Sequence, residues 1–274
     1  MILVTGHKGY IGSHLYKKVK MLGKPVVGID LKDGEDLNER LPDGDFDFVF
    51  HFAALPRVEM SVESPSYTLK QNVLSTSRLL EWSKDHGVKR FIFSSSSAIM
   101  GHGDGVPLSP YGLHKRMSEM ECELYSRIYD LDTVCLRYFN AYSEDQPYGG
   151  AYTTAIAAWM EKIRSCDQLR MDGDGEQTRD LVHVEDIVSA NIFVMNSEQK
   201  FNGKYFNVGS GEAVSMNYIK NYIDEYNKGV SWKYALARKG DARNTLADIS
   251  ELKALGWEPK VSIEEGLKRC FNAS

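Results

Sequence analysis

The chain has 274 residues, of which 42% are hydrophobic and 26% charged, and its formal net charge at neutral pH is −5. This length can bury a sizeable core, in one large α/β unit or in two lobes. The acidic balance and the lack of a run of Lys or Arg argue against nucleic acid as a partner. The four cysteines are scattered without a C-x-x-C pair, and no apolar stretch is long enough to span a membrane. We therefore expect a cytoplasmic protein with reduced thiols and no membrane contact.

The start of the chain predicts a strand, a glycine turn and a helix. Residues 1–4 form an apolar run typical of a buried strand, and a helical pattern extends to about Leu22. Between them, Gly6, Gly9 and Gly12 permit a tight turn and a close approach of the backbone to a phosphate. The helix N-terminus would offer free N–H groups to a pyrophosphate. The alternative is a glycine-rich turn without a ligand, because the spacing differs from the usual G-x-G-x-x-G.

The second predicted strand, residues 26–30, ends in an acid, Asp30. A dinucleotide-binding fold places a carboxylate at this point, on the hydroxyls of the adenosine ribose. An acid there repels a 2′-phosphate, so the pattern favours NAD over NADP, although Lys32 weakens that preference. The alternative is a turn or capping aspartate. Strand, glycine turn, helix, strand and acid in this order predict dinucleotide binding.

Three further strands are predicted before residue 140, over 47–52, 90–93 and 133–138, with helices over 66–86 and after Ser109. Small residues after the strand at 47–52 leave room for a ligand. His51 in that strand is isolated, and we interpret it as structural. Residues 94–97 are four serines that could donate to a substrate oxygen, but the start of a polar loop is the better interpretation of the serines alone.

Beyond about residue 140 the alternation of strands and helices is less regular. We predict helices over 153–165, 183–195 and 216–227, strands over 179–182 and 205–208, and a last helix opened by the capping box Ser262-x-x-Glu265. Residues 172–176 resemble the start of a calcium loop, but Gln177 and His183 occupy the positions of the turn glycine and the bidentate glutamate. We therefore expect no calcium site, and a parallel sheet of βα units with a smaller C-terminal lobe interleaved with it.

Tyr111 and Lys115 stand four residues apart in the helix predicted after Ser109. At this spacing both lie on one face, one turn apart, so the ammonium can approach the phenol. A free tyrosine has a pKa of about 10, and a nearby positive charge lowers it. Lowering the pKa to about 7 requires roughly 4 kcal/mol and would make Tyr111 a proton acceptor near neutral pH. The alternative is a core tyrosine beside a solvated lysine.

Together, the glycine turn, Asp30, the His51-x-Ala-Ala run, the four serines and the Tyr111–Lys115 pair resemble the extended short-chain dehydrogenase/reductase family, and more narrowly its nucleotide-sugar branch. The later segments that fit this branch are Leu136–Asn140, Gly173–Asp186, Phe206–Gly209, Arg238–Asp241 and Leu255–Pro259. The resemblance spans essentially the whole chain. It implies an α/β fold, with a Rossmann-type doubly wound parallel sheet that holds NAD, a smaller α/β C-terminal substrate lobe, and a UDP- or dTDP-sugar in the cleft between them. The NAD-binding domain would cover residues 1–165, with about 176–196 returning to it, and residues 166–274 would form mainly the substrate lobe.

The resemblance also implies a role for each matching residue. Tyr111 would be the acid/base, Lys115 would lower its pKa and hold the nicotinamide ribose, and Ser96 matches the family's catalytic serine. The residues implied in cofactor binding are Gly6, Gly9, Tyr10, Ile11, Gly12, Asp30, Asp36, Leu37, Phe52, Ala53, Ala54, Asn72, Ser94, Tyr111, Lys115 and Phe139. Those implied in substrate binding are Ser95, Ser96, Asn140, Arg179 and Arg238, where the planar forks of the arginines suit a diphosphate. No metal is implied.

The choice within the branch depends on the residues that follow the fourth strand. The 4,6-dehydratases carry Thr-Asp-Glu there and the decarboxylases a glutamate, whereas this chain has Ser-Ser-Ala. Without a carboxylic acid beside Tyr111, elimination of water lacks its acid, while oxidation and re-reduction at C4 need only Tyr111, Ser96 and NAD. The run of residues 51–58 is also similar to UDP-hexose 4-epimerases, especially those for N-acetylated sugars. By the same resemblance, Thr245 matches a position where a bulky residue shuts out an N-acetyl group, so its small side chain implies tolerance of that group.

We therefore expect an isomerase, an NAD-dependent 4-epimerase acting on UDP-glucose and UDP-galactose or on their N-acetylated counterparts. A dehydratase or reductase of the same family and a non-catalytic NAD-sensing protein are the alternatives. The resemblance further implies a homodimer formed through two helices of each subunit, here about residues 66–86 and 111–130.

Overall fold

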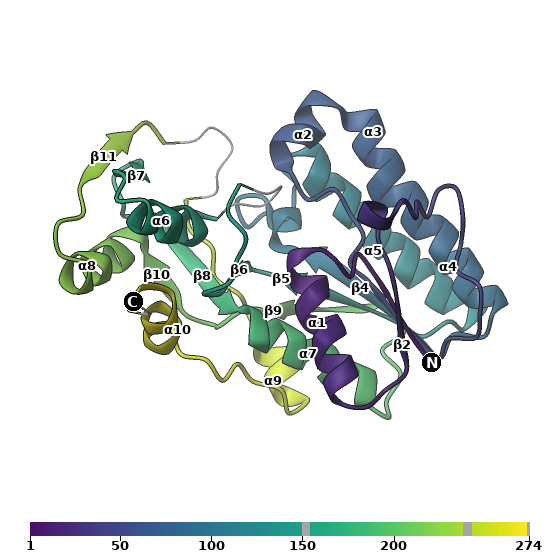
Figure 1. The fold of residues 1–274 in the computed structure, drawn as a ribbon. Helices are drawn as coiled ribbons and strands as arrows, with labels where there is room; N and C mark the ends of the chain where they lie inside the picture. Colours follow the sequence, from purple (N-terminus) through teal and green to yellow (C-terminus); the bar gives the residue numbers. More distant parts are fainter. Residues whose placement is uncertain (150–153, 238–242, 273–274) are drawn as a thin grey trace. The chain divides into compact units, whose positions relative to one another are not determined.

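The computed structural model describes residues 1–149, 154–237 and 243–272, and the chain divides into two compact units (Figure 1). Unit 1 comprises Met1–Tyr138 and Val188–Asn207, and unit 2 comprises Phe139–Ile187 and Val208–Ser274. This division differs from the boundary expected at residue 165. The chain leaves unit 1 earlier because the strand β6 (Asn140–Tyr142) pairs with β8 (Thr178–His183) and not with the central sheet.

Unit 1 contains a six-stranded sheet with the order β2-β1-β3-β4-β5-β9. These strands are β1 (Ile2–Thr5), β2 (Val26–Ile29), β3 (Phe48–His51), β4 (Arg90–Ser96), β5 (Thr133–Tyr138) and β9 (Lys204–Val208). The pairings from β2 through β5 are parallel. The strand order runs in one direction from β1 to β2 and in the other from β1 to β5, which is the reversal typical of a doubly wound sheet. The predicted Rossmann-type fold is confirmed.

The helices of unit 1 lie in the connections between these strands (Figure 1). They are α1 (Tyr10–Met21), α2 (Val58–Glu63), α3 (Pro65–Leu69), α4 (Ser75–Asp85), α5 (Pro110–Tyr129) and most of α7 (Val184–Asn196). Because parallel crossovers are right-handed and the strand order reverses at β1, α1 and α4 cover opposite faces of the sheet. The helix predicted over residues 66–86 contains a π-helical segment at Lys70–Leu74, between α3 and α4. Ser109 caps α5 through its hydroxyl, which accepts from the Gly112 N–H at 3.2 Å.

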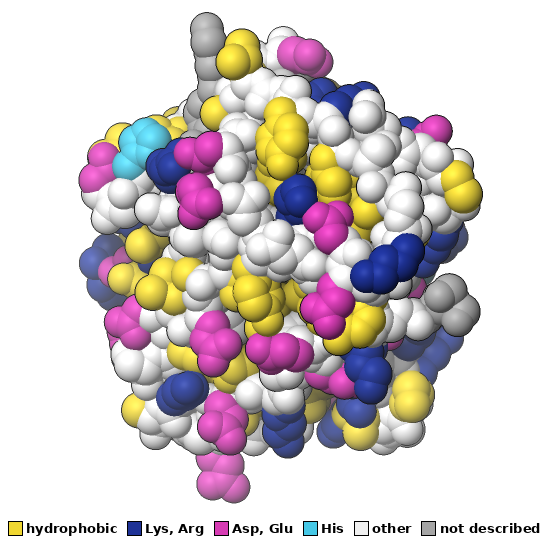
Figure 2. Space-filling model, turned by 90° about the vertical axis from the view of Figure 1, so that its left-hand side faces the viewer, with side chains coloured by type: hydrophobic (Ala, Val, Ile, Leu, Met, Phe, Trp, Pro, Cys, Tyr) yellow, Lys and Arg dark blue, Asp and Glu magenta, His cyan; other side chains and the backbone are white. Residues whose placement is uncertain are grey.

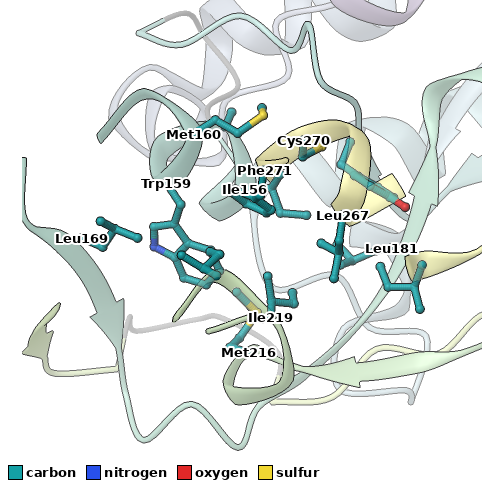
Figure 3. Close-up of a cluster of buried hydrophobic side chains, with 14 of the residues drawn as sticks. Ile156, Trp159, Met160, Leu169, Leu181, Met216, Ile219, Leu267, Cys270 and Phe271 are labelled. Atoms are coloured by element: carbon teal, nitrogen blue, oxygen red, sulfur yellow. The ribbon is translucent and has the colours of Figure 1, made fainter. Parts of the chain in front are cut away.

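Unit 2 is a smaller α/β unit with two short sheets. The strand β10 (Ala213–Ser215) joins β8 and β6 in one sheet, and β11 (Trp232–Ala235) pairs with β7 (Leu169–Asp172) in the other. The helices are α6 (Ala155–Arg164), α8 (Met216–Tyr226), α9 (Ser250–Ala254) and α10 (Ile263–Phe271). Figure 3 shows how Trp159 of α6, Ile219 of α8 and Leu267 of α10 converge in one buried hydrophobic cluster. The strands β6, β7, β10 and β11 were not predicted, because they are short and lack the largely apolar runs that mark β1 and β3.

The surface and the described side chains limit the kinds of site that the molecule offers. In the face shown in Figure 2, basic side chains are interspersed with acidic ones and form no continuous basic area. Among the described residues, no helix is long and apolar enough to cross a membrane, and no group of three or more His, Cys, Asp or Glu could hold a metal ion. All four cysteines are free.

Candidate active site

The glycine turn between β1 and α1 has no room for side chains at two of its positions. Gly6 has a φ of +73°, and a Cβ there would lie 2.6 Å from the backbone N of Ala53. A Cβ on Gly12 would lie 2.2 Å from the carbonyl oxygen of Gly6. Gly9 is the N-cap residue of α1 and offers no side chain to the free N–H groups of the first helical turn. The turn is therefore a cradle of backbone donors at a helix N-terminus, which fits the pyrophosphate of a dinucleotide.

Asp30 connects this cradle to the end of β2. Its buried carboxylate accepts from the backbone N–H of Lys8 at 2.8 Å and from that of Lys32 at 2.9 Å. Asp30 therefore acts as a capping aspartate, the alternative considered from the sequence, and these hydrogen bonds hold its carboxylate beside the glycine turn. The Lys32 ammonium donates to the carbonyl of Lys8 at 3.0 Å, while the Lys8 ammonium pairs with Asp33.

Asp36 and Leu37 lie in the segment between β2 and β3. The Asp36 carboxylate accepts from the backbone N–H of Asn38 at 2.8 Å and from the side-chain amide of Gln71 at 3.1 Å. Leu37 is buried in the core of unit 1. Asp36 thus joins this segment to the π-helical turn, and an adenine contact from either residue stays a prediction.

The residues after β3 form a loop that Asn72 holds in place. Phe52 donates its N–H to the Thr5 carbonyl at 3.0 Å, and Ala54 follows in the same loop. The Asn72 side chain accepts from the backbone N–H of Leu55 at 2.7 Å and donates to its carbonyl at 3.1 Å. The amide oxygen and nitrogen of Asn72 therefore both bind the loop, and a direct cofactor contact from Asn72 stays a prediction.

His51 is a structural residue, as its isolation suggested. Its Nδ1 lies 2.7 Å from the Thr5 hydroxyl and its Nε2 lies 2.9 Å from the Thr76 hydroxyl. Burial, aided by the charge of Lys115, lowers its pKa to about 3. The ring is therefore neutral near pH 7 and is held by two hydroxyls.

The four serines do not begin a loop, because β4 continues through Ser96 in register with β5. Since side chains alternate along a strand, Ser95 points to the opposite face from Ser94 and Ser96. The Ser95 hydroxyl is buried and donates to Glu119 at 2.7 Å. The substrate contact expected of Ser95 is therefore not supported by the structure. The Ser96 hydroxyl is half-buried and accepts from the Ala98 N–H at 3.2 Å, so its own proton remains for donation.

Tyr111 and Lys115 occupy the first two turns of α5, and both are buried, with exposed fractions of 7% and 4%. The backbone N–H of Tyr111 donates to the Ser61 hydroxyl at 3.0 Å. The Lys115 ammonium donates to the Ser94 carbonyl at 2.6 Å and lies 4.7 Å from the centre of the Phe93 ring. Burial lowers the pKa of Lys115 to about 8, against the opposing charge of Glu119. A solvated lysine, the alternative weighed for this pair, is therefore excluded.

The candidate substrate residues of unit 2 lie around β6 and β8. The Asn140 side chain donates to the Asp180 carbonyl at 2.8 Å and to the Thr245 hydroxyl at 3.2 Å. The Arg179 guanidinium donates to the carbonyls of Thr178 and Arg243, at 2.8 and 3.0 Å. Phe139 is buried at the start of the unit. Arg238 lies outside the described residues.

Sequence reasoning missed several buried charged residues, among them Glu119, Arg137 and Asp180. Glu119 of α5 and Arg137 of β5 form an ion pair with distances of 2.8 and 2.7 Å. The available signal for Glu119 was its position four residues after Lys115, which places both side chains on the same face of the helix. The Asp180 carboxylate accepts from the backbone N–H groups of Ser210, Gly211 and Ala247. No local pattern marks such a carboxylate, because its partners lie 30 residues or more along the chain.

Comparison with known proteins places these features in a family. The profile of the family described as NAD dependent epimerase/dehydratase matches residues 2–209. The chain is 33% identical to a putative UDP-glucose 4-epimerase of Methanocaldococcus jannaschii, over 99% of this chain and 97% of the relative. It is also similar to the solved structure of a UDP-N-acetylglucosamine 4-epimerase from Methanobrevibacter ruminantium, at 30% identity and a TM-score of 0.89 over 99% and 96% of the two chains. A Bacillus cereus UDP-glucuronic acid 4-epimerase, solved with UDP-glucuronic acid and NAD, matches at 29% identity and a TM-score of 0.87 over 99% and 98%. The chain therefore belongs to the NAD-dependent epimerase/dehydratase family.

Proposed function

We propose that the chain is an NAD-dependent UDP-sugar 4-epimerase, an isomerase that inverts C4 of UDP-glucose and UDP-galactose or of their N-acetylated counterparts. The observation that carries this proposal is the burial of Tyr111 and Lys115 one turn apart on α5, with the Lys115 ammonium bound to the Ser94 carbonyl of β4, in the same unit as the glycine cradle. The relatives are named for three different UDP-sugars, which supports the reaction and leaves the sugar open.

The residues of unit 1 would carry the proton chemistry. NAD, when bound, would accept the hydride from C4 and return it to the opposite face of the sugar, so no net redox change occurs. Tyr111 would take the proton of the C4 hydroxyl and give it back at the same oxygen. Lys115 in its charged form favours the phenolate of Tyr111. The free hydroxyl proton of Ser96 would orient the reacting oxygen.

The residues of unit 2 would hold the part of the substrate that does not react. Asn140, Arg179 and, beyond the described residues, Arg238 would bind the diphosphate, because guanidinium groups bridge phosphate oxygens well. The oxidised sugar must then turn about that anchored diphosphate, so that hydride returns to its other face. Arg179 already has a fixed position, because carbonyls of β8 and of the segment at Arg243 hold its guanidinium.

A dehydratase is the nearest alternative, and one observation argues against it. Elimination of water requires an acid that is free to protonate a leaving hydroxyl. The carboxylate of Glu119, which contacts β4 through Ser95, is occupied by Arg137 on both oxygens. A non-catalytic NAD-sensing protein would have no need to bury Lys115 beside Tyr111, since burying an ammonium is costly.

We also propose a cytoplasmic homodimer. On α5, Leu113, Met120, Leu124 and Ile128 are exposed and follow helical spacing, so they form one apolar stripe. A second copy of the chain would cover this stripe, and the four free cysteines fit a reducing compartment. Sedimentation should give a dimer that Met120→Glu dissociates, whereas a wild-type monomer would reject this part of the proposal.

The reaction is tested by incubating the purified protein with UDP-glucose, UDP-GlcNAc and UDP-glucuronate in turn, without added reductant. The anomeric proton signals of each sugar nucleotide are followed by NMR. We expect one of the three to reach equilibrium with its C4 epimer, at constant NAD content. Loss of water seen by mass would instead identify a dehydratase, and turnover that begins only when NADH is added and consumed would identify a reductase.

A further inference from the structure

A closed ionic network lies on the opposite face of β4 from Ser94 and Ser96. Glu119 of α5 accepts from the guanidinium of Arg137 on both oxygens and from the Ser95 hydroxyl on one. All three side chains are buried. The guanidinium of Arg137 also lies 3.4 Å from the centre of the Tyr205 ring. Partners from β4 and β5 therefore fix this carboxylate of α5, and Tyr205 of β9 contacts the arginine that binds it.

The network is one helical turn away from the proposed chemistry. Glu119 follows Lys115 by four residues on α5, so the two side chains are neighbours on one face of the helix. Lys115 is held by the Ser94 carbonyl, directly before Ser95, which is bound to Glu119. Two cations and one anion are thus buried close together, so the charge of Lys115 depends on how Glu119 is shared with Arg137.

We propose that Glu119, fixed by Arg137 and Ser95, is a positioning residue that keeps Lys115 charged while Tyr111 reacts. This inference rests on the proposed function, because Lys115 would act through Tyr111. Glu119 would touch neither substrate nor cofactor. Arg137 has the opposite effect on the same lysine, since it neutralises the carboxylate and adds a buried positive charge.

The other groups that influence Lys115 do not supply this counter-charge. His51 of β3 is neutral near pH 7, because burial lowers its pKa to about 3. Burial likewise raises the pKa of the Cys135 thiol of β5, which leaves it uncharged. On α5 itself, Cys122 carries no carboxylate, and the Tyr111 hydroxyl exchanges its proton during the proposed reaction, so neither residue supplies a permanent counter-charge. Glu119 is the carboxylate in this set, and its charge opposes the loss of the Lys115 proton.

Two substitutions should move the titration of Lys115 in opposite directions. Glu119→Gln removes the anion and leaves Arg137 positive, so Lys115 should lose its proton at a lower pH. Arg137→Gln leaves Glu119 to Lys115 alone, so the proton should be held to a higher pH. We expect shifts of about one pH unit downward and upward, the lower end of the range for a charge within 4–6 Å.

The experiment follows the alkaline limb of kcat against pH for the UDP-sugar that the enzyme epimerises. It also follows the titration of the Lys115 side chain by NMR of protein labelled with ¹³C-lysine, the signal being assigned by its loss in Lys115→Met. Both readouts should shift down in Glu119→Gln and up in Arg137→Gln. Glu119→Asp should restore most of the wild-type profile. The matched control is Glu121→Gln, on the same helix, whose carboxylate binds Ser77 instead.

Opposite shifts separate a charge effect from a structural one, because misfolding lowers activity in both variants without moving the titration. Equal shifts, or lower activity at an unchanged titration, would overturn the inference. If Glu119→Gln does not fold, the titration of Lys115 in Arg137→Gln still tests the inference, because only an upward shift supports it. If the wild-type protein epimerises none of the three UDP-sugars, the proposed function fails, while the lysine titration alone confirms or rejects the role of Glu119.

Discussion

Unit 1 and unit 2 both bury charge, but they compensate it in different ways. In unit 1, Lys115, Glu119 and Arg137 are buried together, and charges of opposite sign face one another. In unit 2, Asp180 is fully buried, and its carboxylate accepts from three backbone N–H groups and from the Ser210 hydroxyl. One arrangement balances charge against charge, and the other surrounds a charge with neutral donors.

We infer that the charged cluster of unit 1 serves catalysis, whereas the enclosed carboxylate of unit 2 serves the stability of the fold. Lys115 loses its proton closer to neutral pH than a free lysine does, because burial lowers its pKa to about 8 and the charge of Glu119 only partly opposes this. A carboxylate enclosed by backbone donors ties together the segments that supply them, here Ser210–Gly211 and Ala247 with β8. We therefore expect substitutions in the first cluster to change catalysis, and those around Asp180 to change stability.

The largest expected effect is the loss of turnover in Tyr111→Phe. This change removes the proton acceptor and leaves the buried ring, so kcat should fall by about 10³-fold while NAD binding and stability stay near wild type. Turnover is measured by NMR of the anomeric protons, and NAD binding by calorimetry. Phenylalanine at Tyr125, a half-buried tyrosine on the same helix, is the matched control. Full activity of Tyr111→Phe would reject the catalytic assignment.

The next effect is on stability, in Asp180→Ala. Removing the carboxylate leaves buried backbone N–H groups without an acceptor, which should cost about 3 kcal/mol of unfolding free energy. Urea unfolding measures this loss. Asp180→Asn keeps one carbonyl oxygen and should lose less. An unchanged unfolding midpoint in Asp180→Ala would show that Asp180 does not hold the two segments together.

Lys115→Met should increase the free energy of unfolding at neutral pH, whereas Asp180→Ala should decrease it. The folded-state pKa of Lys115 is about 8, below its usual 10.5, so the folded state binds that proton more weakly than the unfolded state does. Wild-type stability should therefore rise as pH increases from 8 to 10.5, by up to about 3 kcal/mol. Lys115→Met removes this dependence, and after losing the hydrogen bond to Ser94 it should be about 2 kcal/mol more stable at pH 7. Urea unfolding at pH 7 and pH 9.5 tests this, and parallel pH dependences would contradict it.

The glycine cradle and its helix could be predicted from sequence because every interaction that shapes them is local. Gly6, Gly9 and Gly12 stand within seven residues, and the reason for each glycine is a contact with the turn itself or with the loop at Ala53. The start of α5 was predictable for the same reason, since Ser109 caps a turn only three residues away.

The surroundings of the Tyr111–Lys115 pair could not be predicted in this way. The burial of Lys115 depends on β4, which the sheet brings beside α5, and on Ser94 some 21 residues earlier in the chain. The run of serines resembled the start of a loop because its polarity hid the strand. Its pairing with Leu136, Arg137 and Tyr138 of β5 extends β4 and turns Ser95 toward Glu119.

The smallest expected effect concerns Asp30, a carboxylate held by two backbone N–H groups much as Asp180 is, but placed at the edge of the glycine cradle. Asp30→Asn keeps the shape and removes the charge that would repel a 2′-phosphate, so the preference for NAD over NADP should fall about tenfold. Calorimetric titration of both cofactors measures the ratio. Asp33→Asn, an acid that pairs with the Lys8 ammonium instead, is the control. If the ratio of NAD to NADP affinity falls only in Asp33→Asn, Lys8 sets the cofactor preference. If Asp30→Asn loses stability while this ratio stays constant, Asp30 is a structural carboxylate like Asp180.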